Sequence, residues 1–277
     1  MTLGNITGAA LCAALAAALA ATPALARKLP KPAHVIIVME ENHGYSEIIG
    51  NAGAPYINSL AQSGALFTHS YAVTHPSQPN YLELFSGSTQ GVHDDSCPHS
   101  FAVDSEASQL IAAGRSFVGY SEDLPGEGSL VCTSGKYARK HSPWTNFTNL
   151  PVTTNEPWTA FPKKLKKLPT VAWVIPNLND DMHDGTIAAG DTWLKNNLAD
   201  YAAWAMTHNS LLIVTWDEDD GSQSNQIPTI FVGPMVKQGQ YSEHITHDTV
   251  LATIEAMYGL APLGNAANVQ PIKDVWQ

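Results

Sequence analysis

The stretch His34-Val35-Ile36-Ile37-Val38-Met39, followed at once by Glu40-Glu41-Asn42-His43-Gly44, decides the fold. A short apolar run rich in β-branched residues predicts a buried strand, as found in a parallel sheet covered by helices. Polar residues directly after such a strand are typical of open α/β sheets, whose sites lie at the carboxyl ends of the strands. The stretch therefore predicts a fold class and also the position of a site.

The same alternation of strands and helices continues along the chain. Further strands are predicted at 116–120, 170–175, 211–216 and 229–232, and helices at 56–63, 80–86, 104–113, 191–207 and 248–258. This pattern predicts an α/β fold with a mostly parallel central sheet and helices on both faces. Residues 126–169 show little periodicity, so we expect a long ordered excursion over one face of the sheet.

The composition is globular and acidic. The 277 residues include 14 Lys and Arg and 25 Asp and Glu, which gives a formal charge of −11, and 44% of the chain is hydrophobic. The acidic balance argues against a partner that is a nucleic acid, because binding to its backbone depends on Lys and Arg. It also looks unfavourable for an anionic substrate, unless a cation offsets the charge locally.

Residues 1–26 are predicted to be a signal peptide. Residues 6–26 are rich in alanine and end in Ala24-Leu25-Ala26, a pattern typical of signal-peptidase cleavage. The alternative is an uncleaved membrane anchor, but alanine is weakly apolar for a membrane span. We expect residues 27–277 to form a single domain that is secreted or periplasmic, monomeric and without a transmembrane anchor.

Cleavage would remove Cys12 and leave Cys97 and Cys132. Two cysteines in an exported chain predict one disulfide.

Acidic residues follow two of the predicted strands. Glu41 and Asn42 come after the first strand, and Asp217 and Glu218 come after the strand at 211–216. Carboxylates from two buried strands repel one another unless a cation lies between them. Oxygen ligands of this kind suit one divalent metal ion, Mg, Ca or Mn, and Zn also accepts them. The alternative for residues 217–220 is a solvated acidic turn.

Ser77 is the candidate nucleophile. Pro79 is suited to the first turn of a helix, whose free amides would face the Ser77 hydroxyl and a bound anion. Asn80 could donate a hydrogen bond to a non-bridging phosphoryl oxygen. The alternative for Ser77 is an ordinary helix N-cap.

Two histidines have neighbours that suit acid–base chemistry. His183 lies among Asp180, Asp181 and Asp184, and His141 follows the basic segment 136–140. Either could donate to a phosphoryl oxygen or protonate a leaving group. The alternative is a structural histidine paired with a nearby acid.

These motifs occur together in one known family. The segments are Met39-Glu40-Glu41-Asn42, His75-Pro76-Ser77-Gln78-Pro79-Asn80-Tyr81, Arg139-Lys140-His141-Ser142-Pro143, Asn179-Asp180-Asp181-Met182-His183-Asp184 and Trp216-Asp217-Glu218. The chain resembles the bacterial acid phosphatase and phospholipase C phosphoesterase family, which is related to the alkaline phosphatases. The resemblance extends from about His34 to Trp276 and implies an alkaline phosphatase-like fold.

The resemblance also implies roles for individual residues. It implies metal ligation by Glu41, Asn42, Ser77, Asp217 and Glu218, with Ser77 bridging metal and phosphorus. Substrate contacts and proton transfer would come from Asn80, Arg139, Lys140, His141 and His183. Two further acids follow Glu218 here, so the ligand within residues 217–220 stays open.

The expected function is that of a secreted, metal-dependent acid phosphatase that hydrolyses phosphomonoesters through a phosphoserine. A phosphoinositide at a membrane surface, such as phosphatidylinositol 3-phosphate, is an expected substrate. One alternative is a phospholipase C-type phosphodiesterase. Another is a non-catalytic phosphoinositide-binding effector that faces the membrane with Lys163, Lys164, Lys166 and Lys167, although a solvated lysine-rich segment also explains them.

Overall fold

The computed structural model describes residues 1, 2, 4 and 28–277. The predicted signal peptide therefore lies, apart from residues 1, 2 and 4, outside the described residues. The main strands are β1 (His34–Glu40), β2 (Ala65–Tyr71), β3 (Phe117–Ser121), β6 (Asn155–Pro157), β7 (Val171–Ile175), β8 (Ser210–Trp216), β9 (Gln226–Val232) and β10 (Gly239–Thr246). The helices are α1 (Tyr45–Ile48), α2 (Pro55–Ser63), α3 (Ser77–Ser86), α4 (Glu106–Ala112), α5 (Ile187–Ala205) and α6 (His247–Tyr258).

One eight-stranded sheet forms the centre of the molecule, in the order β10-β2-β9-β8-β1-β7-β3-β6. Strand β9 runs antiparallel to both of its neighbours, β8 and β2, and the other pairings are parallel. The sheet is therefore mostly parallel, and β1 lies near its middle between β7 and β8. The carboxyl ends of these three strands meet at one edge of the sheet.

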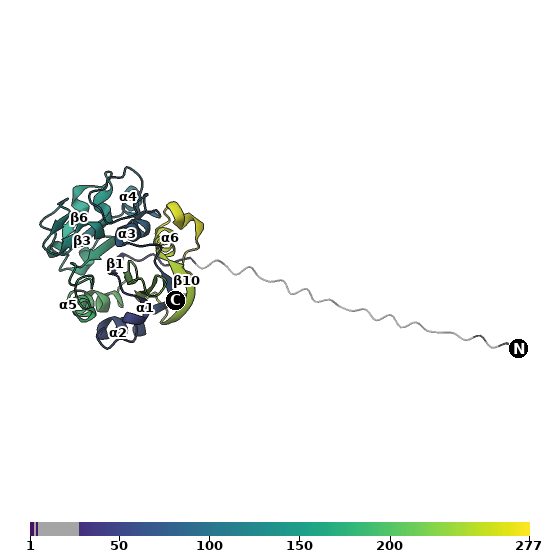
Figure 1. Ribbon diagram of the computed structural model, residues 1–277. Coiled ribbons are helices and arrows are strands. Elements are labelled where there is room, and N and C mark those ends of the chain that lie inside the picture. Colours follow the sequence, from purple (N-terminus) through teal and green to yellow (C-terminus); the bar gives the residue numbers. More distant parts are fainter. Residues whose placement is uncertain (3, 5–27) are drawn as a thin grey trace.

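Helices cover both faces of the sheet (Figure 1). Helices α3, α4 and α6 pack on one face, over a core that includes Ile37, Phe85 and Trp173. Helices α2 and α5 pack on the other face, over a core that includes Val38 and Leu198. Successive strand residues enter opposite cores because side chains alternate across a sheet. The predicted α/β fold with a mostly parallel sheet is confirmed.

Some helix starts differ from the sequence-based expectation. Helix α3 begins at Ser77 rather than at residue 80. Helix α5 begins at Ile187 and is capped by the Thr186 side chain, which accepts from the Ala189 N–H, so the predicted start at residue 191 was wrong. In α4 the cap is Ser105, whose hydroxyl accepts from the Ser108 N–H. These caps place the first turns earlier or later than the apolar periodicity alone predicts.

The irregular segment between β3 and β7 is held by short elements and one disulfide. It contains the two-stranded sheet of β4 (Thr133–Ser134) and β5 (Tyr137–Ala138), and the 3-10 helices η1 (Arg139–His141), η2 (Pro143–Asn146), η3 (Val152–Thr154), η4 (Trp158–Ala160) and η5 (Leu165–Lys167). Cys97 and Cys132 form the predicted disulfide, with Cα atoms 5.9 Å apart. Within residues 28–277, no helix has the length and apolar character to cross a bilayer.

Candidate active site

The site begins where β1 and β8 end side by side. Glu40 pairs with Trp216 in the last register position of these parallel strands, so Glu41 and Asp217 emerge next to each other. The Asp217 N–H donates to the Glu40 carbonyl, at 3.1 Å, and the Asn42 N–H donates to Asp217 Oδ1, also at 3.1 Å. Asn42 has φ of 27°, a left-handed conformation that asparagine tolerates better than most residues. Backbone pairing thus fixes two carboxylates at one point.

Ser77 is the first residue of α3, and Pro76 occupies the cap position. Its hydroxyl lies 3.1 Å from Glu41 Oε2 and 3.0 Å from Glu218 Oε1, so it can donate to either carboxylate. Ser77 is buried, with 2% of its surface exposed. The alternative of an ordinary N-cap serine does not describe this geometry, because the hydroxyl faces side chains from β1 and β8 rather than its own helix.

His141 lies between two buried acids, Glu41 and Asp181. Its Nε2 is 3.0 Å from Glu41 Oε1, and its Nδ1 is 3.3 Å from Asp181 Oδ2. The Tyr81 ring stacks on the imidazole, with centroids 4.9 Å apart and planes at 8°, and the Tyr81 hydroxyl donates to Glu41 Oε1. Asp181 is tied to β1 because its carbonyl accepts from the Glu41 N–H at 2.8 Å.

Burial shifts the pKa values of this cluster strongly. Burial, and then the nearby Asp217 and Asp181 charges, raise the pKa of Glu41 well above its ordinary value. Burial and the Glu218 charge do the same for the pKa of Asp217. Burial, followed by the Lys140 and His183 charges, lowers the pKa of His141. Burial therefore disfavours charge on each of these groups.

The donor set fits a divalent cation. Glu41, Asp217 and Glu218 bring carboxylate oxygens around the Ser77 hydroxyl, and Asp217 Oδ2 is buried without a hydrogen-bond partner. Hard cations prefer such oxygen ligands and would offset the repulsion. Glu41, His141 and Asp181 also offer ligand atoms within 4.8 Å of one another, so this buried group could bind a metal ion as well. Glu41 belongs to both sets.

Charged and polar groups surround the cluster. His183 lies beside His141, with ring centroids 6.1 Å apart, and its Nδ1 is 2.8 Å from Asp184 Oδ1. The Lys140 ammonium pairs with Asp95 Oδ2 at 2.8 Å. Burial alone would lower the pKa of Lys140, but the bond to Asp95 and the Glu41 charge raise it overall, so Lys140 stays charged beside the site.

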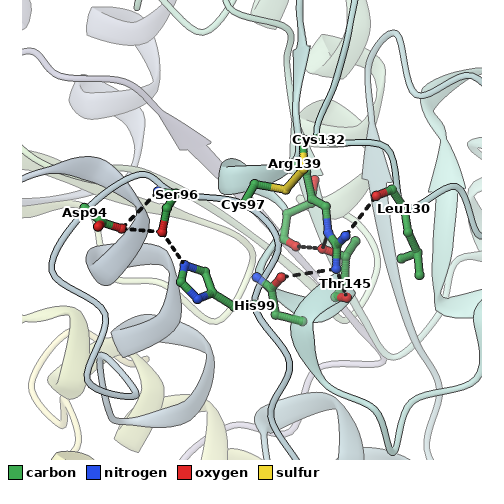
Figure 2. Close-up of a disulfide and its surroundings, with 10 residues drawn as sticks. Asp94, Ser96, Cys97, His99, Leu130, Cys132, Arg139 and Thr145 are labelled. Atoms are coloured by element: carbon green, nitrogen blue, oxygen red, sulfur yellow. Dashed lines mark hydrogen bonds between the residues drawn. A yellow bond between two sulfur atoms is a disulfide. The ribbon is translucent and has the colours of Figure 1, made fainter.

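Two predicted substrate contacts have other partners. The Asn80 side chain accepts from the Val73 and Thr74 N–H groups and donates to the Thr74 and Pro76 carbonyls, so it braces the loop before Ser77. The Arg139 guanidinium donates to the Leu130 and Thr145 carbonyls and to Thr145 Oγ1, beside the disulfide (Figure 2). These bonds give both side chains a role in holding loops.

Several residues of the cluster had no predicted role. His75 Nδ1 is 2.5 Å from Glu218 Oε2 and its Nε2 is 3.2 Å from Asp219 Oδ1. Asp219 also accepts from the Gly221, Gln223 and Asn225 N–H groups, which makes it the centre of a turn rather than a solvated acid. Tyr81 and Asp181 stand within the quoted motifs, but only the folded chain shows that they touch His141.

The lysine-rich segment is remote from this edge of the sheet. Lys163, Lys164, Lys166 and Lys167 are exposed and lie in or next to η5. The chain enters β7 a few residues later, at Val171, whereas the cluster lies beyond the other ends of the strands. The lysines therefore do not border the cluster around Ser77.

Comparison with known proteins identifies the relatives of the chain. A Mycobacterium tuberculosis protein named phosphatidylinositol-3-phosphatase is 52% identical over 275 residues, which cover 98% of this chain and 92% of that protein. An acid phosphatase of Aspergillus fumigatus is 33% identical over 228 residues, 74% of this chain and 51% of that protein. The chain thus spans about half of the fungal relative.

A solved structure supports the fold. An alkaline phosphatase superfamily protein from Vibrio parahaemolyticus matches with a TM-score of 0.61 at 14% identity, over 88% of this chain and 71% of that one. The predicted alkaline phosphatase-like fold is confirmed, and the relatives confirm the predicted enzyme class, a phosphoric monoester hydrolase. The model of the Phosphoesterase family matches residues 51–261, and the chain therefore belongs to the Phosphoesterase family.

Proposed function

We propose that the chain is an exported, metal-dependent acid phosphatase that hydrolyses phosphomonoesters through a phosphoserine at Ser77. The observation that carries this proposal is the position of the Ser77 hydroxyl, 3.0 Å from Glu218 Oε1 and 3.1 Å from Glu41 Oε2, at the start of α3. The name of the mycobacterial relative supports phosphatidylinositol 3-phosphate as a substrate. The disulfide between Cys97 and Cys132 supports export to a secreted or periplasmic location.

The proposed cofactor is one divalent cation held by Glu41, Asn42, Asp217 and Glu218, with Ser77 completing the set. A bound cation lowers the pKa of a coordinated hydroxyl and offsets the negative charge of the phosphoryl group. The unpartnered Asp217 Oδ2 and the raised pKa values of Glu41 and Asp217 support this set.

In the first step, the Ser77 hydroxyl gives its proton to Glu218 or Glu41 and attacks phosphorus. The new Oγ–P bond forms as the P–O bond to the alcohol breaks. His183, beside His141 and oriented by Asp184, gives a proton to the departing alcohol. Water then hydrolyses the phosphoserine and releases inorganic phosphate. Lys140 adds positive charge beside the phosphoryl site.

Hydrolysis of three substrates tests the proposed reaction class. The wild-type protein should hydrolyse an aryl phosphate faster than its methyl diester, and phosphatidylcholine should be a poor substrate. Preferential hydrolysis of either diester would instead favour the phospholipase C-type reaction. Binding to phosphoinositide liposomes without hydrolysis would favour the non-catalytic effector, and a variant with the four lysines neutralised would locate its membrane surface.

Removal of metal tests the proposed cofactor. Treatment with a chelator should abolish turnover of the aryl phosphate, and one added cation, Mg, Ca, Mn or Zn, should restore it. Metal analysis of the purified protein should find that same cation. Full activity in a preparation shown to be free of divalent metal would contradict the proposal.

A further inference from the structure

A cavity lies next to the disulfide, outside the cluster around Ser77. A cavity of about 590 Å³ opens on the face of the sheet that carries α3. Much of its lining is apolar and includes Pro98, Leu130, Trp144, Phe147, Leu150 and Val152. Its volume falls within the range of about 300–1,000 Å³ that is usual for cavities that bind small molecules.

Exposed apolar side chains gather at this cavity. Val152 and Leu130 both line it and have 69% and 57% of their surfaces exposed, and Val131, next in sequence to Leu130, has 43%. Single exposed apolar residues are common on protein surfaces, but a group of them beside an apolar cavity marks a binding surface. The surface therefore suits an apolar ligand that enters from solvent or from a membrane.

The guanidinium in the cavity wall makes its hydrogen bonds to neighbouring loops. Arg139 is the cationic residue of the lining, and its guanidinium donates to the Leu130 and Thr145 carbonyls and to Thr145 Oγ1 (Figure 2). It is buried, with 6% of its surface exposed. A fourth N–H donates to Asn146 Oδ1 at 3.4 Å, so most of the guanidinium is engaged in holding loops, and the apolar side chains of the lining favour hydrocarbon in the cavity.

The cavity and the catalytic cluster share a wall. Arg139 lines the cavity, and Lys140 and His141, the next residues of η1, face the cluster. Lys140 pairs with Asp95, which also accepts from the N–H of Gln78, the residue after Ser77. The cavity and the cluster around Ser77 thus lie on the two sides of η1.

We propose that this cavity holds an acyl chain of the lipid substrate while the phosphorylated headgroup lies at Ser77. This inference rests on the proposed phosphoinositide phosphatase function. It adds that hydrocarbon, and not only the headgroup, contributes to recognition. Leu130 and Val152 are then specificity residues, since they contact the chain and not the reacting atoms.

The test compares substrates that share a headgroup and differ in their chains. The double variant Leu130→Asn/Val152→Asn replaces exposed apolar side chains with neutral polar ones of similar size, so it should fold and add no charge. We expect kcat/KM for dihexadecanoyl phosphatidylinositol 3-phosphate in micelles to fall at least about tenfold, mainly through KM. Turnover of the dibutanoyl lipid and of an aryl phosphate should stay within about twofold of wild type.

Met206→Asn is the matched control. Met206 is also exposed and apolar, at 44%, but it lies at the end of α5 on the other face of the sheet. This variant should hydrolyse all three substrates like the wild type. Aryl phosphate turnover in the same preparations reports on the phosphatase function independently of the cavity.

Several results would overturn the inference. Equal kcat/KM of the wild type for long-chain and short-chain lipids would show that the chains are not recognised. An equal loss of turnover on all three substrates in the double variant would show a structural role for the two residues. A wild-type dimer that becomes a monomer in the double variant, with lipid turnover unchanged, would assign the surface to a second copy of the chain.

Discussion

The Ser77 hydroxyl contacts side chains that come from distant parts of the sequence. Glu41 follows β1, Glu218 follows β8, and either can accept from the Ser77 hydroxyl. Asn80, one turn along α3, braces the loop that precedes Ser77. The Asn80 side chain, which was expected to contact phosphate, instead holds the loop before Ser77. Asn80→Ala should therefore disturb the position of Ser77 more than substrate affinity.

Tyr81→Phe should lower kcat by about ten- to a hundredfold. The substitution removes a hydroxyl that donates to Glu41, and hydrogen bonds to charged groups are worth about 1.5–3 kcal/mol. The ring stack on His141 persists, so the fold should be retained. Steady-state kinetics with an aryl phosphate and circular dichroism measure the two effects. The matched variant Tyr201→Phe loses a buried bond to the Leu211 carbonyl and should lower Tm while kcat stays unchanged.

At the scale of elements, the central strands could be predicted from the sequence and the outer ones could not. Strands β1, β7 and β8 are buried along their whole length or nearly so, and their apolar runs are continuous. Strand β10 has one buried residue among eight, and β6 has only three residues, so neither carries an apolar signal. Strand β2 mixes Thr68, His69 and Ser70 with apolar residues, and it pairs with β9 and β10 only in the folded sheet.

In the site, too, some positions could be predicted from the sequence and some contacts could not. Glu41, Asp217 and Glu218 follow buried strands directly, so strand position predicts that they converge. Tyr81 and Asp181 reach His141 through α3 and the loop after β7, and their contacts depend on packing that periodicity does not reveal. Arg139 stands beside Lys140 in the sequence, but the 3-10 turn of η1 sends its guanidinium to the disulfide side.

Removal of the disulfide should loosen the segment that carries η1. The bond joins residues 35 positions apart, and closing a loop of that length stabilises a protein by about 3–4 kcal/mol in the chain-entropy model. The Arg139 N–H donates to the Cys132 carbonyl, and Asp95 lies just before Cys97, so the bond also positions Lys140. Cys97→Ser/Cys132→Ser should lower both Tm and kcat. An unchanged kcat would show that η1 holds its place without the disulfide.

At the scale of the whole molecule, the net charge of −11 says little about substrate sign, because many acids lie outside the site. A separate group of buried acids lies between the helices of the α3 face. Burial raises the pKa of Glu106 to about 8, of Asp248 to about 8 and of Glu255 to about 7. Glu106 accepts from Trp173 Nε1, and Glu255 accepts from the Leu263 N–H, so both acids help to hold the core.

These acids predict that the protein is more stable in acid. Carboxylic acids in an unfolded chain have pKa values near 4, so between about pH 4 and pH 8 the folded state holds more protons than the unfolded state. The contribution of these groups to the free energy of unfolding should therefore be fully present below about pH 4 and fall as pH rises from about 4 to about 8. Urea titrations at several pH values measure this slope.

Glu106→Gln and Glu255→Gln test the assignment of that slope. Each amide keeps an acceptor for the existing hydrogen bond but cannot ionise, so each variant should lose less stability than the wild type as pH rises. Glu127→Gln alters an exposed acid and should leave the slope unchanged. If the two buried variants follow the wild-type curve, these carboxyl groups do not set the pH dependence.

The central claim is that Ser77 forms a covalent bond to phosphorus. Acid quenching of the metal-loaded protein during turnover of an aryl phosphate, followed by peptide mass spectrometry, tests it directly. The account predicts a phosphoryl group on Ser77 of the wild type, and none on the Ser77→Ala variant, which should also have lost turnover while binding metal. Wild-type turnover by Ser77→Ala, or a phosphoryl group trapped on another residue, would contradict it.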